Sequence, residues 1–171
     1  MRTLKSAVLA AFLLAGAAMP VMAAGLAKPL DLPAQQPAPD PHPYDTAANA
    51  QAQVDAAFVE AKRTGKKVLI DFGANWCPDC RLLASVFEMP QVKAWKDSHF
   101  EAVSVNVDRF NVNMDIPARF GVKVKAIPTV LILTPDGKLL NADGTLALGN
   151  ARTMSPQAAV DLIASWDARG T

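Results

Sequence analysis

The sequence is poor in the residues that hold small or metal-dependent folds together, with two cysteines, two histidines and one tyrosine among 171 residues. Two cysteines cannot staple a disulfide-rich mini-protein or complete a four-thiolate zinc site. An excess of charge of one sign is also missing, since 17 Lys and Arg face 16 Asp and Glu. A chain that is 51% hydrophobic and 19% charged is not a disordered polyelectrolyte, and its balanced charge gives no basis for binding nucleic acid. Evidence for function must therefore come from a local site.

The first 44 residues divide into two segments that differ from the rest of the chain. Residues 1–23 combine a basic start with the uncharged apolar run Ala7–Ala18, which is short for a membrane span and predicts a cleavable secretory signal peptide. A retained N-terminal anchor is the alternative, which Pro20 disfavours. Residues 24–44 contain six prolines and few large apolar side chains, which predicts an extended tether that does not pack. The folded domain is expected over residues 45–171.

Beyond this tether, hydrophobic periodicity predicts an α/β domain. A helix with one apolar stripe is expected after Thr46 and is expected to end at Gly65. Short apolar or alternating runs predict strands, and apolar stripes with capping residues predict further helices. The strands are expected over 68–72, 103–107, 129–133 and 138–141, and the further helices over 78–88, 90–95 and 155–166. This order predicts a mixed sheet of about four strands with helices on both faces.

The two cysteines stand in the sequence Trp76-Cys77-Pro78-Asp79-Cys80, at the predicted junction between a strand and a helix. Free backbone N–H groups and the positive end of the helix dipole favour the thiolate of Cys77, which is the attacking form of a thiol. Cys80 follows one helical turn later, close enough to form a disulfide with Cys77 or to attack a mixed disulfide formed there. This chemistry predicts an exposed sulfur at Cys77. Because disulfides persist outside the cytosol, a static structural bridge is the competing interpretation.

These residues resemble the active site of the thioredoxin superfamily, and the resemblance extends over roughly residues 54–166. It is carried by the strand and helix around the cysteines and by the segment Ile127-Pro128-Thr129. The region looks most like exported members, such as the C-terminal periplasmic domain of the membrane thiol:disulfide interchange reductant. The resemblance implies a three-layer thioredoxin-like fold, with Cys77 as the nucleophile and Cys80 as the resolving thiol.

The resemblance also implies roles for four residues around the cysteines. Asp71 would lie buried beneath the disulfide and accept the proton of the resolving thiol, because burial raises the pKa of a carboxyl group. A strand-end carboxylate that bonds a turn is the alternative for Asp71. Pro128, as a cis residue, would bring the backbone of Ile127 beside the nucleophile, where it could bind an extended substrate. Trp76 would shield the sulfur and contact substrate, and an ordinary half-buried core tryptophan is the alternative.

Several residues near the cysteines differ from those of thioredoxin, and these differences should change the reactivity of the thiols and the titration of Asp71. Pro78 and Asp79 stand between the cysteines where thioredoxin has Gly and Pro, and the negative charge of Asp79 disfavours thiolates. These two residues are therefore expected to tune the pair toward a reductant. Ser104 occupies the place where a lysine usually faces the buried acid, which predicts an altered titration of Asp71. Residues 109–116 are expected to form a loop longer than in thioredoxin and are a candidate for partner selection.

The sequence thus predicts an exported, periplasmic thiol-disulfide oxidoreductase that reduces or exchanges disulfides of other proteins through Cys77 and Cys80. Because a reductant in an oxidising compartment needs electrons, the expected partners are disulfide-containing client proteins and a membrane thiol reductant. No cofactor, metal or nucleic acid is expected. A zinc site with His42 and His99 is disfavoured, because structural zinc sites use spaced ligand pairs and His42 stands in the predicted tether. The alternative function is a thioredoxin-like binding or assembly module with a static disulfide.

Overall fold

The computed structural model describes residues 25–170, so the predicted signal peptide lies outside the described residues. Within them, three strands form one mixed sheet in the order β2-β1-β3, with β1 parallel to β2 and antiparallel to β3. The strands are β1 (Lys67–Gly73), β2 (Phe100–Asn106) and β3 (Thr129–Leu133). The helices are α1 (Ala50–Thr64), α2 (Pro78–Phe87), α3 (Pro90–His99), α4 (Asp115–Ala118) and α5 (Pro156–Asp167), with short 3-10 helices η1 (Ala151–Thr153) and η2 (Ala168–Gly170). In this described part of the chain, no helix is long and apolar enough to cross a membrane.

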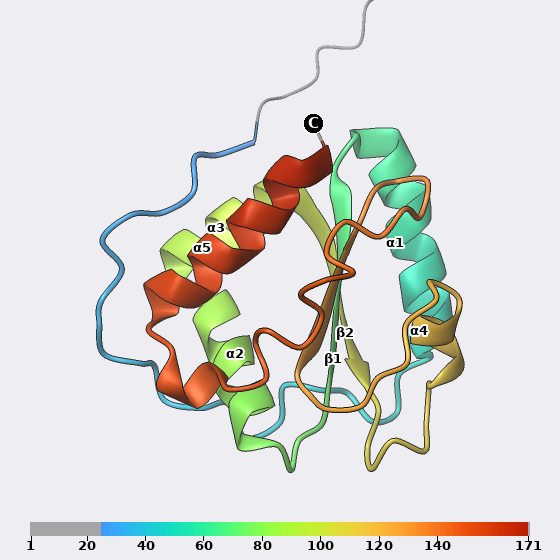
Figure 1. Ribbon diagram of the computed structural model, residues 1–171, viewed down its shortest axis with the longest axis horizontal. Helices are drawn as coiled ribbons and strands as arrows, with labels where there is room; N and C mark the ends of the chain where they lie inside the picture. The colour runs from blue at the N-terminus through green and yellow to red at the C-terminus, as the bar shows by residue number, and fades with distance from the viewer. Residues whose placement is uncertain (1–24, 171) are drawn as a thin grey trace, which may run out of the picture.

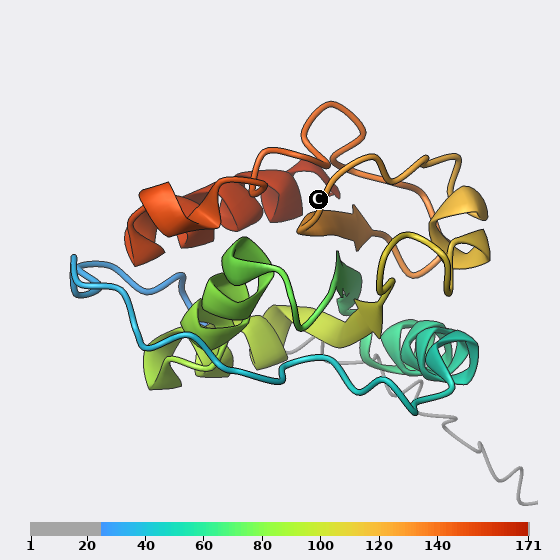
Figure 2. The same cartoon turned by 90° about the horizontal axis from the view of Figure 1, so that it is seen from below.

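Helices cover both faces of the sheet, which confirms the predicted α/β architecture (Figures 1 and 2). On one face, α1 and α4 pack against side chains that include Ile70, Phe72 and Leu131. On the other face, α2, α3 and α5 pack around Leu69 and Ile132. The two-residue period of a strand sends alternate side chains of β1 into the two cores, and its central position buries both faces. β1 leads directly into α2, and this junction holds the two cysteines.

Local sequence signals set the ends of the helices. Gly65 adopts a left-handed conformation (φ 77°) after α1 and ends the helix as predicted, because glycine has no Cβ to clash there. Ser155 caps α5 by accepting a hydrogen bond from a first-turn N–H at 3.2 Å. At the start of α1 the cap is Asn49 rather than Thr46, since the Asn49 side chain accepts the first-turn hydrogen bond at 3.0 Å.

The predicted fourth strand over residues 138–141 is reduced to a single β-bridge to β3. The reason lies in Asn141, which is fully buried. Its side-chain amide accepts from the Ile132 N–H at 3.0 Å and donates to the Val130 carbonyl at 2.8 Å. A side chain thus satisfies backbone groups that a longer strand would have paired, and the described sheet has three strands rather than about four.

Residues 25–44 lie along the outside of α5, α3 and α2 before α1 begins (Figure 1). The sequence prediction that this segment would not pack is wrong. Leu32 and Tyr44, two of its few large apolar side chains, are 8% and 2% exposed. The Leu32 N–H also donates a hydrogen bond to the Gln157 side chain of α5 at 3.1 Å. We call residues 25–44 the N-terminal strap, because this segment is held on the surface of the domain along its length.

Candidate active site

The candidate active site begins where β1 gives way to α2. Cys77 is the N-cap of α2 and has an extended backbone conformation (φ −86°, ψ 112°). Its Sγ accepts a hydrogen bond from the Cys80 N–H at 3.2 Å, and Pro78 takes the first helical position, where no N–H donor is needed. Cys77 and Cys80 form a disulfide, with Cα atoms 5.3 Å apart. The Cys77 sulfur therefore lies at the positive end of the helix.

The expectation that the Cys77 sulfur is exposed is wrong for this disulfide form. Cys77 is 4% exposed, and Cys80 is fully buried. The disulfide draws the Cys77 sulfur toward Cys80, and the Ile127 carbonyl oxygen lies 3.7 Å from it, so little of the sulfur is left open. Trp76 and Pro78 on either side are exposed. Access to the sulfur is therefore restricted in the disulfide form.

Asp71 lies on β1, upstream of the cysteines, and it is 1% exposed. Its Oδ2 accepts a hydrogen bond from the Tyr44 hydroxyl at 2.7 Å, whereas its Oδ1 has no hydrogen-bond partner among the described residues. Burial raises the pKa of Asp71 to about 7, against the opposing effects of the Tyr44 hydrogen bond and the Lys96 charge. A carboxyl group with this pKa can accept a proton near neutral pH.

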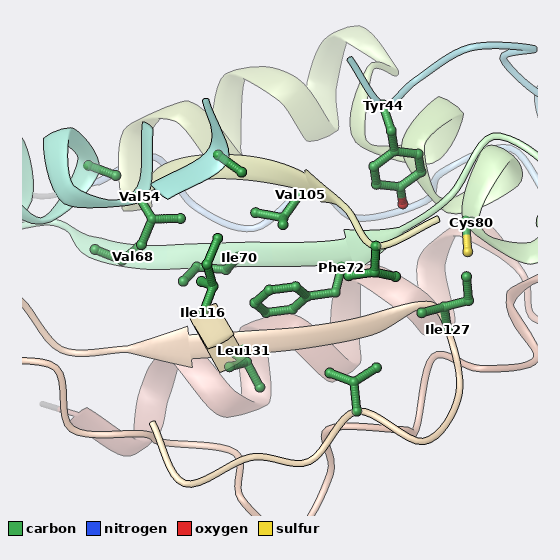
Figure 3. Close-up of a cluster of buried hydrophobic side chains, with 14 of the residues drawn as sticks. Tyr44, Val54, Val68, Ile70, Phe72, Cys80, Val105, Ile116, Ile127 and Leu131 are labelled. Atoms are coloured by element: carbon green, nitrogen blue, oxygen red, sulfur yellow. The ribbon is translucent and has the colours of Figure 1, made fainter. Parts of the chain in front are cut away.

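Tyr44 is the residue of this site that the sequence did not reveal. It comes from the N-terminal strap and directs its hydroxyl at the end of β1, near which Cys80 also lies (Figure 3). Burial, together with the neighbouring Asp71, raises the pKa of Tyr44 well above its ordinary value, so the hydroxyl stays protonated at neutral pH. The available signal was small: Tyr44 is the only tyrosine in the chain and follows Pro43. No local periodicity connects it to Asp71 on β1.

The segment before β3 approaches the disulfide from the other side. The Ile127–Pro128 peptide bond is cis, and both residues are buried. The Ile127 carbonyl oxygen is the atom that lies 3.7 Å from the Cys77 Sγ. The structure therefore brings Ile127 and Pro128 to the disulfide, although they are about 50 residues away in the sequence.

The arrangement of a cysteine pair at a helix start, a buried acid and a cis-proline agrees with a comparison with protein families. A family model described as thioredoxin-like matches residues 49–135. The matched range contains Asp71, both cysteines and Pro128. The chain belongs to the thioredoxin-like family.

Relatives with solved structures and known names agree with the thioredoxin-like assignment. The chain is 38% identical to a disulphide isomerase from Xylella fastidiosa Temecula1, with a TM-score of 0.68 and coverage of 72% of this chain and 95% of that one. It is 32% identical over 98 residues to the thiol:disulfide interchange protein DsbD of Pseudomonas fluorescens, and 30% identical over 100 residues to probable nucleoredoxin 3 of Oryza sativa subsp. japonica. These two matches cover 56% and 47% of this chain but only 16% and 21% of the relatives. The predicted thioredoxin-like fold is confirmed.

Trp76 lies at the surface of this thioredoxin-like site and is 46% exposed. Its indole N–H donates to the Asp108 carbonyl at 2.9 Å, and the Arg109 guanidinium lies 5.7 Å from the centre of its ring. These contacts tie Trp76 to the loop after β2, where Phe110 is also exposed. The indole is therefore held in place while its ring remains accessible to a partner.

Asp79 is not an unpaired charge in this thioredoxin-like domain. Its Oδ1 accepts from the Arg152 N–H at 2.9 Å, and its Oδ2 accepts from the Arg152 Nε at 3.0 Å. These bonds place η1 against the first turn of α2. The guanidinium offsets part of the negative field that Asp79 exerts on the cysteines, which weakens the sequence argument that Asp79 favours a reductant.

The remaining residues singled out in the sequence lie around the site or away from it. Ser104 stands opposite the buried acid in the register of β1 and β2. His42 is exposed on the strap. His99 contacts the Asp167 carboxylate and the Leu26 carbonyl, each at 2.7 Å, and so connects α3, α5 and the strap. Within the described part of the chain, no group of three or more His, Cys, Asp or Glu residues could hold a metal ion.

Proposed function

We propose that the protein is a thiol-disulfide oxidoreductase that exchanges disulfides with other proteins through Cys77 and Cys80. The observation that carries the proposal is the Cys77–Cys80 disulfide at the N-terminus of α2, with the Ile127 carbonyl beside the Cys77 sulfur. The helix terminus favours the Cys77 thiolate, which is the nucleophile of exchange. The names of the relatives, a disulphide isomerase and a thiol:disulfide interchange protein, support the same chemistry.

In the reducing direction, the Cys77 thiolate attacks a client disulfide, and one client sulfur leaves as a thiolate. The new bond is a mixed disulfide between Cys77 and the client. Cys80 then gives its proton to Asp71 and attacks the Cys77 sulfur, which releases the second client thiolate and forms the Cys77–Cys80 disulfide. Two electrons pass from the protein to the client. Asp71 suits this proton transfer because burial raises its pKa to about 7.

We assign the binding of the client to the surface around the disulfide. The backbone at Ile127 and Pro128 lies beside the Cys77 sulfur, where an extended client segment can form main-chain hydrogen bonds. Trp76 offers an exposed apolar ring next to the same sulfur. Pro78 and Asp79 tune the reactivity of the pair, with the charge of Asp79 offset in part by Arg152.

We also propose that the protein is exported to the periplasm and works as a reductant there. The basic and apolar sequence of residues 1–23 supports export. The part of the Asp79 charge that Arg152 does not offset supports the reducing direction. Each turnover oxidises the pair, so a membrane thiol reductant is the expected electron donor. Cleavage near Ala23, measured by sequencing the N-terminus of the exported protein, tests the first point. The equilibrium of the pair with glutathione tests the second.

The 4% exposure of Cys77 favours a second candidate function. In this alternative, the protein is a thioredoxin-like binding or assembly module whose disulfide is static. A static bridge exchanges slowly, and neither cysteine forms a mixed disulfide with a client.

Single-cysteine variants of the purified protein distinguish the two functions. Reduced Cys80→Ser and Cys77→Ser proteins are mixed with a disulfide-bonded peptide, quenched with acid and examined by mass spectrometry. Exchange predicts a stable peptide adduct on Cys77 in Cys80→Ser, because the resolving thiol is missing, and much less adduct in Cys77→Ser. Equal absence of adduct from both variants would support the static module. The same pair of variants expressed in cells then identifies the clients and the electron donor.

A further inference from the structure

The N-terminal strap is anchored on the elements that carry the cysteines. The Asn75 side chain, in the loop before the disulfide, accepts from the Tyr44 N–H at 3.0 Å and donates to the Tyr44 carbonyl at 2.9 Å. Earlier in the strap, the Asp40 N–H donates to the Ser85 hydroxyl at 2.7 Å, and the Asp40 carbonyl accepts from the Arg81 Nε at 2.8 Å. Ser85 and Arg81 belong to α2. The strap therefore holds the Tyr44 backbone in a fixed place beside the site.

β1 leaves space for the Tyr44 ring at Gly73. A Cβ atom at position 73 would lie 2.1 Å from the Tyr44 Oη and 2.2 Å from its Cζ. A packed interior does not accommodate such distances, so any larger residue at this position would displace the ring. The glycine at the end of β1 thus permits the close approach of the phenol.

The ring delivers its hydroxyl to one oxygen of a buried carboxyl group. The Tyr44 hydroxyl lies 2.7 Å from the Asp71 Oδ2, and the two residues are 2% and 1% exposed. The other oxygen, Oδ1, has no hydrogen-bond partner in the described residues. The register partners of Asp71, Ser104 on β2 and Val130 on β3, carry no charge. Cys80 shares a buried cluster with Tyr44 at this end of β1 (Figure 3).

We propose that Tyr44 is a positioning residue for the transfer of a proton from Cys80 to Asp71. By holding Oδ2, the phenol fixes the carboxyl group so that Oδ1 receives the proton. This inference rests on the proposed function, because the transfer is a step of disulfide exchange. In it the S–H bond of Cys80 breaks, an O–H bond forms on Asp71, and the Cys80 thiolate displaces the client thiolate from Cys77. The Tyr44 O–H bond stays intact.

One charged group on the helices acts on Asp71. Lys96, on α3 and 8% exposed, acts on Asp71 through its charge, and its ammonium lies 3.3 Å from a Glu88 carboxylate oxygen. Cys80, on α2, is the proton donor in the proposed step. Tyr44 is the one side chain of the described residues that donates a hydrogen bond to the Asp71 carboxyl. Because the pKa of Tyr44 is raised, it remains a donor while Asp71 titrates.

The variant Tyr44→Phe tests the proposal, because it keeps the buried ring and removes the hydroxyl. Ser85→Ala is the matched control, since it removes one contact of the strap with α2 and leaves the phenol in place. The Asp71 carboxyl is titrated in the oxidised full-length protein by carbon NMR, and Asp71→Asn assigns its signal. Losing a hydrogen bond to the charged form should raise the pKa of Asp71 from about 7 by about one unit in Tyr44→Phe. Ser85→Ala should leave it unchanged.

The same variants are then compared in the reaction. The rate at which a mixed disulfide between Cys77 and a peptide resolves is measured by quenched flow from about pH 5 to about pH 9. The midpoint of this profile should rise by about one unit in Tyr44→Phe and stay in place in Ser85→Ala. In an Asp71→Asn background, Tyr44→Phe should no longer move the midpoint.

Each result bears on the proposal in a different way. An NMR titration of Asp71 that does not move in Tyr44→Phe would overturn the proposed positioning contact. A titration that moves while the reaction profile does not would show a structural hydrogen bond without a part in exchange, and would also overturn the proposal. A wild-type protein that forms no mixed disulfide would overturn the proposed function, and the NMR titration would still decide whether Tyr44 controls Asp71.

Discussion

Replacing Asp71 by asparagine should change how the stability of the oxidised protein depends on pH. Asp71 is 1% exposed, and burial raises its pKa from 3.8 to about 7. In the unfolded chain the same carboxyl is solvated and titrates normally. The folded state therefore binds this proton more tightly than the unfolded state, and ionisation of Asp71 destabilises the fold.

A difference of about three pKa units corresponds to about 4 kcal/mol. Below the unfolded pKa both states are protonated, and the stability linked to Asp71 is fully present. It is lost as the pH rises toward the folded pKa, and above about pH 7 the loss is complete. Asparagine cannot ionise. Relative to the wild type, Asp71→Asn should therefore gain about 4 kcal/mol in unfolding free energy between about pH 4 and about pH 8.

Urea unfolding of both oxidised proteins across this pH range measures the gain. The buried amide of the new asparagine has N–H groups to satisfy, which costs about 1–3 kcal/mol at every pH, so the test is the pH dependence of the difference. Asp161→Asn is a control of opposite sign. Hydrogen bonds from Lys28 and Gln157 lower the pKa of Asp161, so its contribution is present at neutral pH and is lost as the pH falls.

A constant stability difference between wild type and Asp71→Asn would refute the reasoning, because it would mean that folding leaves the pKa of Asp71 unchanged. A difference that instead grows toward acid pH would mean that the carboxylate is stabilised by a partner in the fold. Neither result is compatible with an acid whose titration is dominated by burial.

Two other predictions concern contacts that join distant parts of the chain. Arg152→Ala leaves the charge of Asp79 unbalanced beside the cysteines, which should disfavour the thiolates. The redox potential of the pair, measured against glutathione, should therefore become more negative by about 10 mV. A less negative potential would contradict this. Leu32→Ala should destabilise the protein by about 2–3 kcal/mol in urea unfolding, because Leu32 is 8% exposed. Leu30→Ala, in the same strap but 68% exposed, should have almost no effect, and equal losses in both variants would argue against a packed strap.

The parts of the fold that follow from short-range rules were predictable from the sequence. Gly65 and Ser155 mark helix ends through local backbone chemistry, so their neighbours in the sequence suffice to identify them. The placement of Cys77 at a helix start likewise depends on a strand and a helix that adjoin it in the chain. The resemblance of this local sequence to a known superfamily then predicted that Pro128 lies near the cysteines in space.

The errors concern contacts that sequence patterns do not encode. The amide of Asn141 replaces strand pairing through hydrogen bonds to β3 that no propensity scale includes. Arg152 pairs with Asp79 across 73 residues, so the net field at the cysteines could not be read from the motif alone. The buried Cys77 depends on the approach of Ile127 from a distant segment.

The composition of the strap does not indicate that it packs. Six prolines suggest an extended chain without a core, and the segment is indeed free of helix and strand. Extended backbone can still pack when a few side chains find apolar sites, and Leu32 and Tyr44 are sufficient to hold it. An extended chain also reaches far per residue, which lets the strap pass α5 and α2 before it delivers Tyr44 to Asp71.

In the proposed exchange reaction the strap contributes to the chemistry as well as to the fold, because its Tyr44 acts on the pKa of Asp71. A solvated aspartate, with a pKa near 3.8, is too weak a base to take a proton from a thiol efficiently. Burial alone would raise the pKa of Asp71 above about 7 and favour the protonated acid at neutral pH, which cannot accept a proton. The Tyr44 hydrogen bond and the Lys96 charge act against burial, and the balance falls at about 7. Because one of these two opposing groups comes from the strap, a segment without helix or strand contributes to the proton affinity of the buried acid.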